Sequence, residues 1–153
     1  MTNTIAAERP DSADAMQLIA ELEAELEPLY ARESRHGYSV EKLLRENVAF
    51  FVARLGGAAA GCGGVQVCSS EYGEVKRMYV RPEFRRFGLG VLMLNRLEQH
   101  ARGQGVGLLR LETGIYQTQA IALYERCGFK RIEPFGHYRD DPVSAFYEKR
   151  IIG

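Results

Sequence analysis

The amino-acid sequence predicts a mixed α/β fold in which helices enclose one β-sheet. Residues 89–105 repeat apolar side chains at every fourth position, as an amphipathic helix does. Residues 48–55 are rich in β-branched and aromatic side chains, which is typical of a strand. The predicted elements follow the order helices, three strands, helix, strand, helix and two strands. This order favours helices that pack on a shared sheet.

The first predicted element is a helix over residues 11–30. Asp11 or Ser12 can cap its N-terminus, and Pro28 closes it. Its apolar side chains recur at helical spacing: Met16, Leu18, Ile19, Leu22 and Leu26. Residues 31–39 form a polar connection, and residues 40–47 form at most a short second helix.

Three strands are predicted next. Residues 48–55 and 56–70 form a hairpin that turns at Gly56 and Gly57. The many glycines of its second strand indicate close backbone approach or a bulge. The third strand covers residues 72–80, in which two sets of side chains alternate: Val75, Arg77 and Tyr79 with Glu74, Lys76, Met78 and Val80.

The second half of the chain begins with the helix over residues 89–105. Its apolar face contains Leu89, Met93, Leu97 and Ala101, and Gly103 or Gly105 ends it. A strand over residues 106–113 leads to a helix over residues 117–129, whose apolar face contains Ala120, Ile121, Leu123 and Tyr124. The last two strands cover residues 130–135 and 144–151, and a polar loop joins them.

Length and composition predict one domain over residues 1–153. Lysine and arginine balance aspartate and glutamate at 20 each, which argues against nucleic-acid or anionic-membrane partners. No apolar run approaches the roughly 20 residues of a membrane-spanning helix. The N-terminal residues lack the pattern of a secretory signal, so the cytoplasm is the expected location.

The three cysteines, Cys62, Cys68 and Cys127, match no zinc-binding spacing. We interpret them as reduced packing residues, and we expect no metal site.

The loop before the helix at residue 89 predicts an anion site. Arg85 and Arg86 precede Gly88 and Gly90, where a helix begins. A helix N-terminus carries unpaired N–H groups and a partial positive charge, and glycine lets an anion approach the backbone. The sequence lacks a P-loop motif, and Met93 occupies the third glycine position of a dinucleotide motif. The alternative is a surface loop with incidental arginines.

Two motifs together resemble the GNAT superfamily of N-acetyltransferases. The first is R-x-x-G-x-G at Arg85, Gly88 and Gly90. The second lies on the next helix, at Ala120, Leu123, Tyr124, Gly128 and Phe129. The resemblance covers roughly residues 45–151. It implies a twisted, mostly antiparallel central sheet of six to seven strands flanked by about four helices.

The resemblance also implies acetyl-CoA as co-substrate and direct acetyl transfer from its thioester to an amine. The backbone of Met78, Tyr79 and Val80 would pair with the pantetheine arm. The pyrophosphate would be wrapped by a second group of residues: Arg85, Arg86, Phe87, Gly88, Leu89, Gly90 and Val91. The sequence departs from the family pattern at one position of the second motif. Gln117 stands there, where the family has an asparagine that often contacts the cofactor.

The same resemblance assigns candidate catalytic roles. Tyr124 would be the general acid for the leaving thiolate, and the alternative is a core aromatic side chain. Glu74 or Glu112 would be the general base. The alternatives are salt-bridged strand carboxylates, with a water chain accepting the proton.

The acceptor would be shaped by residues 30–39 and 135–144. Asp140 and Asp141 can attract a cationic amine or form a solvated turn. Arg35 or Arg139 can hold a carboxylate. Four further residues are open candidates: His36, Tyr38, His137 and Tyr138.

Three functions remain open at this point. The first is an acetyl-CoA-dependent N-acetyltransferase for a primary amine of a small molecule. The second is a protein or peptide N-acetyltransferase, and the third is a non-catalytic acyl-CoA-binding module. Residues 144–151 resemble late strands that pair across a homodimer in this family.

Overall fold

The computed structural model describes residues 2–35 and 38–152. Its strands are β1 (Asn3–Ala7), β2 (Ala49–Leu55), β3 (Ala58–Val67), β4 (Tyr72–Val80), β5 (Leu108–Gly114), β6 (Lys130–Ile132) and β7 (Ser144–Arg150). Its α-helices are α1 (Ala13–Leu26), α2 (Val40–Arg45), α3 (Leu89–Gly103) and α4 (Thr118–Arg126). Short 3₁₀ turns lie at Arg32–Ser34 and Pro82–Phe84. Among these elements, no helix is both long and apolar enough to cross a membrane.

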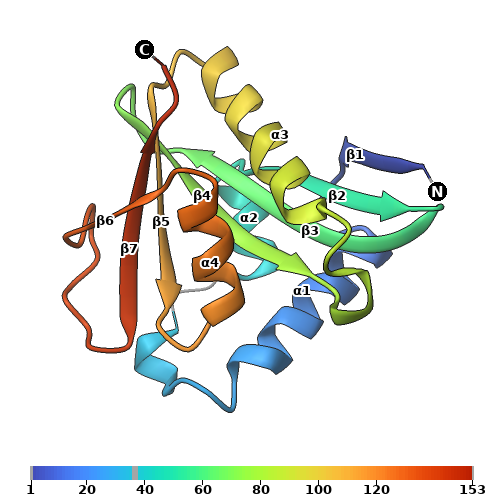
Figure 1. The fold of residues 1–153 in the computed structure, drawn as a ribbon, viewed down its shortest axis with the longest axis horizontal. Helices are drawn as coiled ribbons and strands as arrows, with labels where there is room; N and C mark the ends of the chain where they lie inside the picture. Colours follow the sequence, from blue (N-terminus) through green and yellow to red (C-terminus); the bar gives the residue numbers. More distant parts are fainter. Residues whose placement is uncertain (1, 36–37, 153) are drawn as a thin grey trace.

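The strands form one seven-stranded sheet in the order β1-β2-β3-β4-β5-β7-β6. Neighbouring strands are antiparallel except β4 and β5, which are parallel. One core cluster joins α3 and α4 to the sheet, and a second joins α1 and α2 to it. Figure 1 shows α3 and α4 in front of the strands and α2 behind them. The predicted mixed α/β fold with helices around one sheet is therefore confirmed.

The helical periodicity of α3 is confirmed in full. Leu89, Met93, Leu97 and Ala101 are each at most 1% exposed and face the sheet. In α1 the pattern holds less strictly, because Leu18, Ile19 and Leu22 are buried whereas Met16 is 46% exposed. The residue that replaces Met16 on the buried face is Ala15, whose small side chain gave no signal in the sequence.

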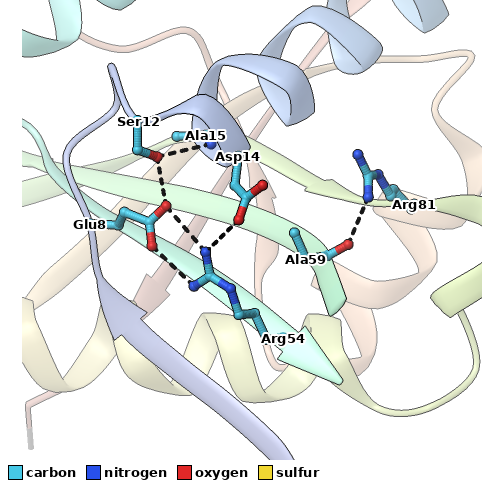
Figure 2. Close-up of polar contacts among 7 residues, drawn as sticks. All are labelled: Glu8, Ser12, Asp14, Ala15, Arg54, Ala59 and Arg81. Carbon is cyan, nitrogen blue, oxygen red and sulfur yellow. Dashed lines mark hydrogen bonds and ion pairs between the residues drawn. The ribbon is translucent and has the colours of Figure 1, made fainter. Parts of the chain in front are cut away.

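The sequence did not predict β1. Four of its five side chains are exposed, so it has no alternating pattern and pairs along one edge with β2. Figure 2 shows the polar contacts that hold the segment between β1 and α1 in place. Arg54 donates hydrogen bonds to Glu8 and to Asp14, at 3.0 and 2.8 Å, and so joins β2 to the segment between β1 and α1.

Of the two predicted caps for α1, the structure selects Ser12. Its hydroxyl oxygen accepts a hydrogen bond from Ala15 N at 3.1 Å, and the hydroxyl donates to Glu8 at 2.6 Å. Asp11 instead pairs with Arg9.

Ser12→Ala is expected to lower the free energy of unfolding by about 1 kcal/mol, because it removes a helix cap. Urea unfolding followed by circular dichroism measures this change. Ser70→Ala, in the exposed turn before β4, is the control and should change stability by less than about 0.5 kcal/mol. Equal losses in both variants would contradict the capping role.

The alternation predicted for β4 is wrong at its centre, because the strand contains a bulge. Cys62 pairs with Tyr79 and Gly64 with Lys76, which leaves Gly63 opposite two residues, Arg77 and Met78. Arg77 takes a φ of 54°, in the left-handed region. The four residues from Glu74 to Arg77 are all buried, because the two core clusters cover both faces of the sheet.

The bulge lies where β4 leaves β5. Their parallel ladder has only three paired positions and ends at Glu74 and Arg110. Beyond that point the two strands diverge, and α4 lies across the widening gap (Figure 1). The backbone of β4 from Met78 to Val80 therefore faces an opening instead of a neighbouring strand.

Candidate active site

Two cavities meet at the opening between β4 and β5. The larger one, called the groove below, has a volume of about 860 Å³ and is lined by the end of β4, the start of α3 and one side of α4. The smaller one, called the inner cavity, has a volume of about 110 Å³ and is lined by α1, the segment after it, β4, β5 and α4. Met78, Gln117, Ala120 and Tyr124 line both. These shared residues form the boundary between the two cavities.

The groove collects the residues predicted to bind the cofactor. All of them line it except Phe87, whose side chain is 52% exposed. Gly88 precedes α3 with a φ of 76°, a left-handed conformation in which other residues are strained. The N–H groups of the first turn of α3 have no acceptor within the helix and lie at the groove. This turn therefore fits an anionic group.

Arg85 is held at the groove by three contacts. Its Nε donates to Val80 O at 2.9 Å, and its terminal nitrogens contact Glu25 at 3.0 Å and Gln119 at 3.3 Å. The guanidinium is thus oriented before any ligand binds. Close packing against α4 also favours glycine at position 90, which the sequence did not reveal. A Cβ at Gly90 would lie 2.7 Å from Leu123 Cδ2.

Tyr30 orients the loop between β5 and α4. Its hydroxyl accepts a hydrogen bond from Tyr116 N at 2.9 Å and donates to Gln117 Oε1 at 3.3 Å. Gln117 is the N-cap residue of α4 and lies at the boundary of the two cavities. Sequence reasoning gave Tyr30 no role of its own, although it opens the connection that was expected to shape the acceptor site.

The Tyr30 ring packs directly on Gly114, where a Cβ would lie 2.1 Å from the ring. Gly114→Ala is therefore expected to displace Tyr30 and to lower the free energy of unfolding by roughly 1–3 kcal/mol. Urea unfolding measures this loss. Gly103→Ala at the end of α3, where a Cβ would meet nothing within 4 Å, is the control and should not destabilise the protein. A neutral Gly114→Ala variant would contradict the close packing.

Tyr124 is a core residue and a cavity residue at once. It is 5% exposed, packs edge-to-face on Phe129 at 5.8 Å, and lines both the groove and the inner cavity. Burial and the nearby charge of Glu112 raise the pKa of its phenol. The hydroxyl therefore keeps its proton at neutral pH and can act as a donor.

Glu112 and Glu74 both line the inner cavity, but in different surroundings. Burial raises the pKa of Glu112 to about 7, although Ser144 donates a hydrogen bond to its carboxylate at 2.9 Å. Glu74 accepts a hydrogen bond from Tyr138 at 2.5 Å, and its carboxylate lies 3.0 Å from Lys76 Nζ. Glu74 thus already has a donor and a cation, whereas Glu112 has the basicity suited to accept a proton near neutrality.

The two segments predicted to shape the acceptor site meet beside the inner cavity. Ser34 donates a hydrogen bond to Asp141 at 2.7 Å, and Asp141 also accepts one from Val143 N, as in a turn. Of the open candidates, Arg35, Tyr38 and Tyr138 line the inner cavity. The side chains of His137, Arg139 and Asp140 are exposed and are not part of its lining. His36 lies outside the described residues.

Sequence reasoning missed two cations of the inner cavity, Lys76 and Arg77. The available signal was a run of charges inside an otherwise apolar strand. Cys62 behaves as a packing residue, because burial raises the pKa of its thiol to about 12. In the described part of the chain, no three metal-ligating side chains gather in one place.

Known families and proteins resemble this chain over most of its length. Residues 14–129 match the model of the acetyltransferase (GNAT) family. An IAA acetyltransferase of Azospirillum brasilense is 44% identical over 149 residues, which cover 97% of both chains. An uncharacterised N-acetyltransferase of Bacillus subtilis is 35% identical over 121 residues, which cover 78% of this chain and 80% of the relative.

Two solved structures show the same architecture. A Klebsiella pneumoniae protein assigned to the acyl-CoA N-acyltransferases is 36% identical, with a TM-score of 0.84 over 99% of both chains. An N-acetyltransferase of Thermoplasma acidophilum in complex with coenzyme A is 22% identical, with a TM-score of 0.78 over 98% of this chain and 99% of that one. The similarity to the Thermoplasma acidophilum protein is a similarity of fold.

Proposed function

The chain belongs to the acetyltransferase (GNAT) family and is an acyltransferase; from this premise we propose that it transfers the acetyl group of acetyl-CoA directly to the primary amine of a small molecule. The observation that carries the proposal is the opening between β4 and β5. There a large groove meets a small cavity, and the hydroxyl-bearing Tyr124 lines both. A donor that enters from one side can meet an acceptor that enters from the other.

In this proposal acetyl-CoA occupies the groove. The backbone of Met78 to Val80, freed from β5 by the divergence of the strands, adds the pantetheine arm like a further strand. The first turn of α3, with Arg85 and Arg86, binds the pyrophosphate. The fold shared with the coenzyme A complex from Thermoplasma acidophilum supports this placement. Phe87 stays a prediction, because it is absent from the lining of the groove and its side chain is half exposed.

Two side chains carry out the two proton transfers of the proposed reaction, Glu112 as the base and Tyr124 as the acid. Glu112 is the proposed base: it takes the proton that the ammonium must lose before its nitrogen lone pair attacks the thioester carbonyl. A C–N bond forms and the C–S bond breaks, and Tyr124 gives its proton to the departing sulfur. A backbone N–H near Met78 stabilises the charge that develops on the carbonyl oxygen. The raised pKa values of both side chains support these roles.

The size of the inner cavity favours a small acceptor over a peptide. Its volume of about 110 Å³ is small beside the roughly 300–1,000 Å³ of a typical ligand pocket. A polypeptide would need an open channel on this side of β4 and β5. The name of the 44% identical relative, an IAA acetyltransferase, also supports a small molecule.

A thiol-release assay with acetyl-CoA tests the proposal against amino acids, polyamines, aminoglycosides and short peptides. We expect release that depends on one class of small amine. Release with peptides alone would favour a protein acetyltransferase. Tight acetyl-CoA binding by calorimetry without release from any amine would favour a non-catalytic binding module. Cytoplasmic location and a homodimer stay predictions from the sequence, and size exclusion with light scattering checks the dimer.

A further inference from the structure

The inner cavity holds three cationic side chains with nitrogen atoms that lack a hydrogen-bond acceptor. These atoms are Arg35 Nε, Lys76 Nζ and Arg77 Nε, and each is buried from solvent. All three residues line the inner cavity. A buried donor without an acceptor costs free energy, so three of them around one cavity indicate a missing acceptor group.

The burial of two of these side chains is nearly complete. The side chains of Lys76 and Arg77 are 5% and 4% exposed. Lys76 Nζ lies 3.0 Å from Glu74 without hydrogen-bond alignment and 3.8 Å from the centre of the Tyr38 ring. Cations are rarely buried in this way unless an anion accompanies them.

The bulge in β4 is what brings both cations to one side. Lys76 and Arg77 are adjacent, and adjacent residues of a regular strand point to opposite faces. The left-handed φ of 54° at Arg77 breaks that rule, and both side chains line the inner cavity. A strained conformation of this kind, away from glycine, is typical of functional sites.

Two carboxylates form the ion pairs of the three cations at the inner cavity. Arg35 and Arg77 share a single carboxylate, because Glu23 lies 3.9 Å from Arg35 and also pairs with Arg77. Lys76 has Glu74. Glu23 and Glu74 therefore serve three cations between them, and the remaining carboxylate of the inner cavity, Glu112, accepts a hydrogen bond from Ser144 instead.

We propose that the acceptor is an amino acid-like molecule, whose carboxylate binds at Arg35, Lys76 and Arg77 while its amine faces Glu112. This inference rests on the proposed acetyl transfer. The small volume of the inner cavity requires that only a few bonds separate the amine from the carboxylate. Such a zwitterion adds one positive and one negative charge, and each finds its counterpart.

The test compares amino acids with their carboxamides in the thiol-release assay. The amide keeps the amine and removes the negative charge. We expect kcat/KM to be at least about 100-fold higher for the preferred amino acid than for its amide, because the amide brings no negative charge to the buried nitrogen atoms that lack an acceptor. The matched sulfonate, taurine beside β-alanine, distinguishes a carboxylate site from a general anion site.

Arg35→Gln is the diagnostic variant, because Arg35 lies in the segment after α1 and not in the strained strand. It should reduce the preference for acid over amide about tenfold or more, and Lys76→Met should do the same. Arg32→Gln, an exposed arginine of the same segment, should keep the wild-type preference. An acid-to-amide ratio near one in the wild type, or a ratio that Arg35→Gln and Lys76→Met leave intact, would overturn the inference.

The two proposals fail in different ways. If neutral amines accept the acetyl group as well as amino acids do, acetyl transfer stands and the carboxylate site falls. If no amine accepts it, the proposed function falls, and calorimetric titration of amino acids and their amides into the coenzyme A-bound protein tests the site alone. Binding that requires the carboxylate would support it, and equal or absent binding would overturn it.

Discussion

Replacing Glu112 by glutamine is expected to lower kcat/KM near pH 8 by roughly 100-fold or more, because it removes the proposed general base. In the wild type, kcat/KM should rise with pH through about 7, since only the ionised carboxylate accepts a proton and burial raises its pKa to about 7. The variant should lose this acid limb. A pH–rate profile with saturating acetyl-CoA measures both effects.

Glu74→Gln is the matched control for that experiment. Glu74 lies in the same inner cavity but is already engaged by Tyr138 and Lys76. It should keep the acid limb, whatever its effect on the overall rate. An acid limb that disappears only with Glu74→Gln would make Glu74 the base, and one that persists in both variants would favour a water chain.

The same Glu112→Gln change should increase the stability of the protein above about pH 7, the range in which it lowers activity. The folded-state pKa is raised to about 7 from an ordinary value of 4.5, so the folded state binds a proton more tightly than the unfolded one. The wild type therefore loses stability as pH rises from about 4.5 to about 7. Above that range the glutamine variant should be more stable by roughly 1–3 kcal/mol, and near pH 4 the two should agree. Urea unfolding at both pH values checks this.

Tyr124→Phe is expected to lower kcat by roughly 10- to 100-fold, because the sulfur would then leave without a proton. The phenol keeps its proton at neutral pH, since burial and Glu112 raise its pKa. The phenylalanine ring preserves the contact with Phe129, so the fold should survive. Steady-state thiol release and a thermal melt measure the two quantities.

Tyr147→Phe is the matched control for Tyr124→Phe. Tyr147 is 2% exposed, belongs to the same core cluster, and donates its hydroxyl to Glu125 away from both cavities. It should keep the wild-type kcat. If Tyr124→Phe kept it too, Tyr124 would be a packing residue and the thiolate would take its proton from water.

The parts of the fold that follow local patterns could be predicted from the sequence. The four-residue spacing in α3 and the glycine and arginine motif before it depend on neighbours within one segment, and both reappear in the structure. β1 could not be predicted, because a strand exposed on both faces has no apolar alternation. Its position depends on pairing with β2, which lies more than forty residues away.

The sequence predicted the residues of the candidate site that belong to recognisable motifs. It did not predict the residues whose position depends on the pairing register of two strands. Tyr124, Glu74 and Glu112 do line one cavity. The cationic side of that cavity depends on Gly63 of β3 standing opposite two residues of β4, and no local pattern in β4 encodes this register. Tyr30 was missed for a similar reason, because its partner Gly114 is distant in the chain.

The short parallel ladder between β4 and β5 divides the sheet into two parts, called plates below, that are joined at only three paired positions. One plate, β1 to β4, contains Glu74, Lys76 and Arg77, and the other, β5 to β7 with α4, contains Glu112 and Tyr124. Small rotations about three paired residues would change the distance between these groups without breaking either plate. A donor molecule bound along Met78 to Val80 and against α4 would bridge the plates and lock that distance. We therefore expect coenzyme A to slow amide hydrogen exchange at the seam more than within either plate.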